Sequence, residues 1–205
     1  MVPSGGNADA PCRLLRFGVF KVGEPGSRLQ EWAFTRENFD RIRPAGVIYN
    51  ATNPDLTAFR DHGGKLIIYH GWADQAISPL GTLAYYQAVQ DRMGGLAATQ
   101  QFARLFMFPG MYHCQGGYGP NRFDMVSAIA DWVEQGQPPE RIVASLVDEQ
   151  DTLIRTRPAF PYPQVAQYTG FGSLDSADNY VAATPQGQPN DAVHWAGEDL
   201  FGAPG

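Results

Sequence analysis

The chain has 205 residues, of which 43% are hydrophobic, 12% aromatic and 18% charged, as in globular proteins and unlike disordered, fibrous or coiled-coil ones. Its 15 basic and 21 acidic residues give a net charge of −6, which argues against nucleic acid as a partner because phosphate binding requires a basic surface. No apolar run approaches the roughly 20 residues of a membrane-spanning helix, so no membrane segment is predicted.

Residues 1 to about 44 show no sustained hydrophobic period, and we predict no core of their own for them. They also begin without the basic segment and the apolar segment of a secretory signal peptide. Further along, Asn53 and Pro54 are typical of a helix start, and Gly63-Gly64 is typical of a helix end. A short helix is therefore predicted over residues 53–60.

The segment 65–70 is a compact apolar run between glycines, which predicts a strand that is buried on both faces. After a turn, Ser78 provides a helix cap and Pro79 a first helical residue, so a helix is predicted over 79–93. The apolar stripe of this helix is predicted to consist of Leu80, Leu83, Ala84, Val89 and Met93.

A second strand is predicted over 103–108, followed by the loop 109–117 and a second helix over about 122–135. The apolar face of that helix is predicted to consist of Phe123, Val126, Ile129, Ala130 and Val133. The order strand, helix, strand, helix predicts a mostly parallel sheet with crossover helices, which is the α/β class. A mostly irregular tail is predicted from the prolines Pro158, Pro161, Pro163, Pro185 and Pro189.

One ionisable residue follows each predicted strand: Asp74 follows the first and His113 the second. Active sites of α/β proteins form at the carboxyl ends of strands, and an acid followed by a histidine is the order of the last two members of a hydrolase triad. In that role His113 takes and returns a proton, while Asp74 fixes the tautomer of the imidazole. The residues alone leave open a capping role for Asp74 and an exposed position for His113.

Several segments together resemble the tannase and feruloyl esterase family of α/β-hydrolases, over residues from about 45 to 182. This resemblance implies a partial α/β-hydrolase fold with a remnant of a lid-like region over 1–44. The C-terminal part of the catalytic domain is then expected over 45–182 and an irregular Pro/Gly-rich tail over 183–205. The segments that carry the resemblance are Pro54–Phe59, Gly63–Pro79, Pro109–Gly117, Trp132–Gly136 and Arg157–Pro163.

The resemblance implies a serine carboxylesterase for small aromatic esters, such as those of gallate or ferulate or the monoesters of terephthalate. Asp74 and His113 match the family's acid and base. In the family, the serine follows a cysteine that bonds to the cysteine after the histidine, which here is Cys114. The resemblance also implies a secreted or periplasmic full-length protein. No cofactor is expected in this chain, because the family's calcium site would lie in the lid.

The chain departs from this pattern in its nucleophile. None of its seven serines lies in the G-x-S-x-G elbow that places a nucleophilic serine after a strand. Because acid and base come last in chain order, we expect the serine, its cysteine and the oxyanion loop upstream of residue 1, and an inactive isolated chain. Phe160 and Val181 stand where a second family disulfide is expected, so that bridge is not predicted.

The neighbours of the candidate pair have alternative interpretations. Trp72 and Tyr112 are predicted to line an acyl or alcohol pocket, with packing in the core as the alternative. His70 is interpreted as a hydrogen-bonded structural histidine, with a second imidazole at the site as the alternative. A metal site of His70, Asp74 and His113 has no supporting motif, and no metal is predicted.

Two further hypotheses compete with the serine esterase. In the first, Cys114 is the nucleophile, with Asp148 and His194 in the order Cys, Asp, His. In the second, the chain is a non-catalytic fragment or binding module whose open sheet edge associates, which predicts aggregation or dimerisation.

Overall fold

The computed structural model describes residues 33, 35–45, 50–113 and 115–185. The chain divides after Ala51 into two compact units. The described part of the first unit is helix α2 (Arg36–Ile42) followed by the 3-10 turn η2 (Arg43–Ala45). The Thr35 hydroxyl caps α2 by accepting the backbone N–H of Asn38 at 3.2 Å. Within the described ranges, no helix has the length and apolar character that crossing a bilayer requires.

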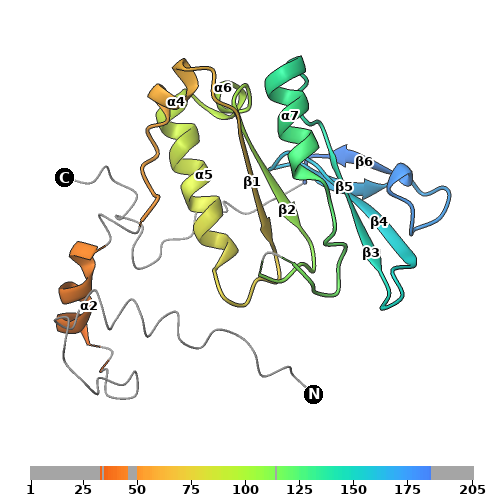
Figure 1. Ribbon diagram of the computed structural model, residues 1–205, viewed down its shortest axis with the longest axis horizontal. Helices are drawn as coiled ribbons and strands as arrows, with labels where there is room; N and C mark the ends of the chain where they lie inside the picture. Colours follow the sequence, from red (N-terminus) through yellow and green to blue (C-terminus); the bar gives the residue numbers. More distant parts are fainter. Residues whose placement is uncertain (1–32, 34, 46–49, 114, 186–205) are drawn as a thin grey trace. The chain divides into compact units, whose positions relative to one another are not determined.

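The second unit contains a parallel strand–helix–strand motif (Figure 1). Strand β1 (Leu66–Gly71) runs parallel to β2 (Ala103–Phe108), so their carboxyl ends lie together. Helix α5 (Pro79–Met93) and the short helix α6 (Leu96–Thr99) connect them. The predicted bounds of α5 and β2 are confirmed.

Helix α4 (Thr57–Asp61) precedes β1 and begins later than predicted. The Asn53 side chain closes a turn by accepting the backbone N–H of Asp55 at 2.9 Å, and Asp55 in turn accepts the backbone N–H of Thr57 at 3.0 Å. These side-chain bonds offer the backbone an alternative to the helix, and they delay its start.

The prediction of a first strand buried on both faces is wrong. Tyr69 in β1 is 41% exposed, whereas every residue of β2 is buried. Within the described residues, β1 pairs with β2 and with no other strand. An apolar run shows that a strand can be covered, but it does not show that both of its faces are covered.

Four further strands follow β2. Two of them lie wholly in the segment after Pro158, so the prediction of an irregular tail is wrong up to residue 183. Strand β3 (Ile142–Val147) pairs antiparallel with β4 (Leu153–Ala159), and β5 (Val165–Tyr168) pairs antiparallel with β6 (Tyr180–Ala183), which follows the 3-10 turn η3 (Ala177–Asn179). The prediction of a mostly parallel sheet is therefore correct for β1 and β2 alone. Pro158 is tolerated in β4 because a strand of a two-stranded sheet is an edge strand.

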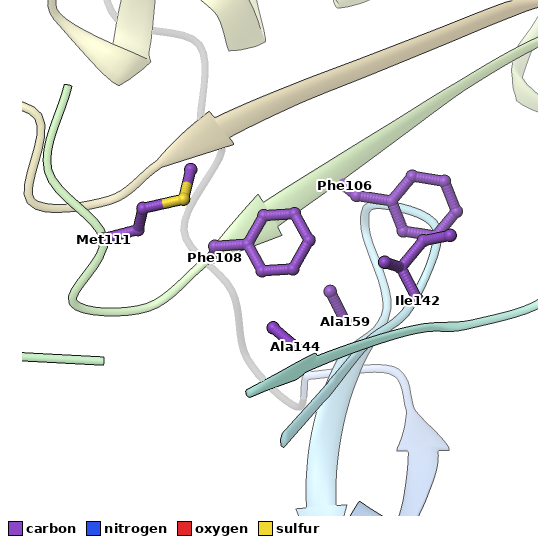
Figure 2. Packing of buried hydrophobic residues seen from close by; sticks show 6 residues of the cluster. All are labelled: Phe106, Phe108, Met111, Ile142, Ala144 and Ala159. Atoms are coloured by element: carbon purple, nitrogen blue, oxygen red, sulfur yellow. The ribbon is translucent and has the colours of Figure 1, made fainter. Parts of the chain in front are cut away.

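Strand β2 lies between two layers of apolar side chains. On one face, Leu105 and Met107 pack against Leu83 and Tyr86 of α5. The other face packs on β3 and β4, and Figure 2 shows its side chains directed toward these strands. That cluster consists of Phe106, Phe108, Met111, Ile142, Ala144 and Ala159, all at most 5% exposed. This double packing fixes the carboxyl end of β2 and the loop that follows it.

Helix α7 (Met125–Gln135) begins after Asp124, whose carboxylate accepts the backbone N–H of Ser127 at 2.9 Å. The predicted apolar face of this helix is wrong in part, because Val126 is 78% and Val133 60% exposed. The buried residue is Trp132, which is 3% exposed and packs with its ring 5.5 Å from the guanidinium carbon of Arg104. Periodicity finds an apolar stripe, but it does not identify what covers the stripe.

Candidate active site

Asp74 lies in the turn after β1 and His113 in the loop after β2. Since β1 and β2 are parallel neighbours, both side chains emerge at the same edge of the sheet. The Nδ1 atom of His113 lies 2.8 Å from Oδ2 of Asp74, which is hydrogen-bonding distance. The structure thus brings together the two residues that the sequence singled out, although 39 positions separate them.

Short backbone contacts hold the Asp74 turn against the His113 loop. The Trp72 N–H donates to the Phe108 carbonyl at 2.9 Å, and the Ala73 N–H donates to the Met111 carbonyl at 3.1 Å. Gly71 is required at this junction, because a Cβ on it would lie 2.1 Å from the Met111 carbonyl oxygen.

Four donors surround the Asp74 carboxylate, whose side chain is 3% exposed. Its Oδ1 accepts the backbone N–H groups of Ala76 and Ile77 at 2.8 and 2.9 Å. Its Oδ2 faces ring nitrogens of His113 and His70 at 2.8 and 3.0 Å. Because both of its oxygens accept hydrogen bonds, the carboxylate is held in a single orientation.

These contacts determine the ionisation of Asp74. Burial raises the pKa of its carboxyl, but hydrogen bonds from the Ile77 backbone N–H, the His113 ring and the Ala76 backbone N–H lower it by more. The pKa therefore lies well below the usual range of an aspartate, and the group is an anion at neutral pH.

The geometry also assigns the tautomer of His113. An ionised Asp74 only accepts hydrogen bonds, so Nδ1 of His113 carries the hydrogen and Nε2 presents a lone pair. The His113 side chain is 46% exposed, and its Nε2 has no hydrogen-bond partner within the described part of the chain. An imidazole held in this tautomer can take a proton at Nε2 while Asp74 stabilises the resulting positive charge.

The loop around His113 is closed on itself. The Tyr112 N–H donates to the Gly116 carbonyl at 3.1 Å, and Met111 forms a bridge with Gly117. Gly117 has a φ of 107°, and a Cβ on it would lie 2.1 Å from the carbonyl oxygen of Gly110. Only glycine fits this conformation and contact.

The two aromatic residues predicted to line a pocket are close to the pair in sequence, because Trp72 precedes Asp74 by two positions and Tyr112 directly precedes His113. Trp72 is 42% exposed, and the Tyr112 ring packs edge-on against Tyr118 with centroids 5.5 Å apart. A cavity of about 420 Å³ is lined by residues from the start of this loop and from the strands after α7, among them Pro109, Tyr118 and Arg157. Neither predicted pocket residue lines it, and neither Asp74 nor His113 does.

Of the residues in the cysteine-nucleophile hypothesis, the structure describes Asp148, whereas Cys114 and His194 lie outside the described residues. The other cysteine of the sequence, Cys12, also lies outside them. The Asp148 carboxylate closes the turn between β3 and β4 by accepting the backbone N–H groups of Gln150 and Thr152 at 2.9 and 2.8 Å.

No metal centre emerges from the described residues. Among them, no group of three or more His, Cys, Asp and Glu side chains could hold a metal ion. His70, Asp74 and His113 instead hydrogen-bond to one another.

Sequence reasoning missed Thr82 and the two backbone donors to Asp74. Thr82 in α5 lies 2.7 Å from His70 Nδ1, a contact across 12 positions that no local pattern indicates. The backbone donors had a signal, because an aspartate in a turn commonly accepts an N–H two residues on.

Comparison with known proteins identifies an esterase family. Residues 24–183 match the family described as tannase and feruloyl esterase, and the chain belongs to that family. This match confirms the resemblance seen in its motifs.

Named relatives support this assignment. The chain is 46% identical over 139 residues to mono(2-hydroxyethyl) terephthalate hydrolase of Piscinibacter sakaiensis, a match covering 67% of this chain and 23% of that protein. It is 39% identical over 150 residues to a probable feruloyl esterase of Arthroderma benhamiae, covering 72% and 27%. The chain thus spans about a quarter of the length of these relatives.

Solved structures agree with the sequence relatives. An esterase from Aspergillus oryzae superposes with a TM-score of 0.74 at 25% identity, over 84% of this chain and 37% of that one. Feruloyl esterase B from Aspergillus oryzae gives a TM-score of 0.72 at 25% identity, over 82% and 36%.

Proposed function

We propose that this chain carries the acid and base of a serine carboxylesterase that hydrolyses esters of aromatic acids. The observation that supports this most strongly is the 2.8 Å hydrogen bond between His113 Nδ1 and the buried carboxylate of Asp74. The nucleophilic serine, which belongs to no elbow motif of this sequence, comes from polypeptide outside these 205 residues.

The residues act in two half-reactions. His113 Nε2 takes the proton of the serine hydroxyl as the serine oxygen attacks the ester carbonyl, and His113 then gives that proton to the departing alcohol. In the second half, His113 takes a proton from water as the water oxygen attacks the acyl-enzyme. It returns this proton to the serine oxygen as the bond to the acyl group breaks and the acid leaves. Asp74 stabilises the imidazolium that forms in each half.

The proposed substrates are small esters of gallate or ferulate and monoesters of terephthalate. The support comes from relatives whose names include a terephthalate monoester hydrolase, feruloyl esterases and a tannase. Trp72 and Tyr112 offer aromatic surface beside the pair for such acyl groups. In this proposal the full-length protein is secreted or periplasmic, and Cys114 bonds to the cysteine before the serine.

The test compares two polypeptides. One is the 205-residue chain, and the other is a longer polypeptide that also contains the residues encoded upstream of Met1. We expect ferulate and p-nitrophenyl esters to be hydrolysed by the longer polypeptide and not by the chain alone. His113→Ala should lower kcat of the longer polypeptide by at least about 10³-fold. His62→Ala is the matched control, because within the described residues that exposed ring bonds only to the Ala58 carbonyl of α4.

Two outcomes would contradict the proposal. Hydrolysis by the isolated chain, abolished by His113→Ala, would place a nucleophile within these residues. Rapid thiol labelling near neutral pH, together with loss of that hydrolysis in Cys114→Ser, would identify the cysteine as this nucleophile.

A further inference from the structure

His70 contacts Asp74 from a position that the proposed mechanism does not use. Its side chain is 11% exposed, and its Nε2 lies 3.0 Å from Asp74 Oδ2 and 3.2 Å from the Ile77 carbonyl oxygen. On the other side of the ring, Nδ1 lies 2.7 Å from the Thr82 hydroxyl oxygen. Both ring nitrogens therefore have partners.

These partners assign the tautomer of His70. A carboxylate oxygen and a carbonyl oxygen both accept hydrogen bonds, so Nε2 carries a hydrogen and donates toward Asp74 and Ile77. Nδ1 then accepts the hydrogen bond that the Thr82 hydroxyl donates. Every polar atom of the ring is satisfied in this arrangement.

The fold leaves this ring little freedom. Side chains alternate along a strand, so His70 shares a face of β1 with Ile68, which packs on the cluster of Leu83 and Tyr86 beneath α5. His70 ends this row, and Thr82 belongs to the first turns of the same helix. The ring thus connects β1, the Asp74 turn and α5.

We propose that His70 is a positioning residue of the Asp74–His113 pair. Its Nε2–H donates to the same Asp74 oxygen that accepts the Nδ1–H of His113, and it keeps this oxygen in place. Thr82 orients His70. This inference deepens the proposed function and rests on it for the catalytic role of the pair, whereas the positioning itself is independent of any ester.

The positioning has a measurable consequence for His113. Without the His70 donor, Oδ2 loses one of its two partners, while Oδ1 stays bound to the backbone N–H groups of the turn. With one donor fewer, the carboxylate turns more freely about its bond to Cβ, and the hydrogen bond from His113 becomes longer on average. His113 should spend a larger fraction of time with the hydrogen on Nε2, where it cannot act as a base.

The first experiment measures the ring nitrogens of His113 by ¹⁵N NMR in the 205-residue chain. In the wild type we expect the hydrogen on Nδ1, with slow exchange against solvent. His70→Ala should raise the Nε2–H fraction and accelerate exchange of Nδ1–H. His70→Gln should restore most of the wild-type spectrum, because a glutamine amide can donate from nearly the position of the histidine Nε2. His62→Ala should change nothing.

Thr82→Val keeps the result interpretable if His70→Ala unfolds the chain. It removes the hydroxyl at nearly constant shape, and we expect a smaller change of the His113 spectrum in the same direction. Circular dichroism checks folding of each variant. An unchanged His113 tautomer and exchange rate in folded His70→Ala, or in folded Thr82→Val if the alanine variant does not fold, would overturn the inference.

The second experiment separates this inference from the proposed function. In the active longer polypeptide, His70→Ala should lower kcat by about 10- to 100-fold with little change in KM, because a displaced base affects the reaction more than binding. Altered NMR spectra without any esterase activity in the longer polypeptide would reject the function and leave the positioning intact. An unchanged kcat in His70→Ala of an enzyme that needs His113 would reject the positioning role alone.

Discussion

At the scale of single residues, the carboxylate of Asp74 is the most constrained group of the site. Backbone N–H groups hold one of its oxygens and two imidazoles the other. Its environment therefore combines near-complete burial, which opposes the charge, with hydrogen bonds from the Ile77 N–H, the His113 ring and the Ala76 N–H, which favour it. The net effect is a pKa below the ordinary value.

This lowered pKa predicts how stability depends on pH. A carboxyl group whose folded-state pKa lies below its unfolded value of about 3.9 stabilises the fold fully above that value. The contribution is lost as the pH falls from there through the lower folded-state pKa. Asp74→Asn removes this contribution, so the difference in free energy of unfolding between wild type and variant should shrink from pH 7 to pH 3. Urea titrations at each pH measure this difference in free energy of unfolding. A difference that does not change with pH would contradict the lowered pKa of Asp74.

At the scale of elements, the junction of β1 with the loop after β2 depends on Gly71. We predict that Gly71→Ala destabilises the chain by about 1–3 kcal/mol, because the added Cβ would meet the Met111 carbonyl oxygen at 2.1 Å. Gly81 is the matched control, since a Cβ there meets nothing within 4 Å in α5. Gly81→Ala should stabilise the chain by about 0.5–1 kcal/mol. Urea denaturation of both variants measures their free energies of unfolding. Equal effects of the two substitutions would contradict the prediction that Gly71 is required for the close contact.

The elements that the sequence predicts well have local start and stop signals. Pro79 occupies the first helical position of α5, and Gly94 ends it with a φ of 94°, so both boundaries are encoded within the helix and its flanks. No local signal of this kind indicates which side chains of α7 are buried. Val126 and Val133 are exposed because the cover of a helix face depends on the tertiary arrangement.

The same distinction applies to the site. The pairing of Asp74 with His113 was predictable because parallel neighbouring strands bring their carboxyl ends together and the loop motifs match a known family. The contact of His70 with Thr82 was not, because it depends on how α5 packs over β1. Likewise, Pro158 argues against a strand locally, while pairing with β3 overrides that preference.

At the scale of the whole molecule, the chain corresponds to about a quarter of the length of the named relatives, and its parallel sheet is correspondingly small. In the described residues β1 has a strand partner on one side only, while the exposed fraction of Tyr69 on this strand is 41%. A strand edge that has no partner in the described residues, next to a partly exposed aromatic side chain, favours pairing with another chain.

We therefore predict that the isolated chain self-associates through β1. Light scattering should show an average mass above that of the monomer, increasing with concentration. Tyr69→Lys should lower this mass, because a charge on an edge strand opposes strand pairing. Phe171→Lys, a substitution of an 82% exposed residue in the segment between β5 and β6, is the matched control and should leave it unchanged. A monomer at every concentration would show that the β1 edge does not associate, and an equal decrease in both variants would assign the association to general hydrophobicity instead of this edge.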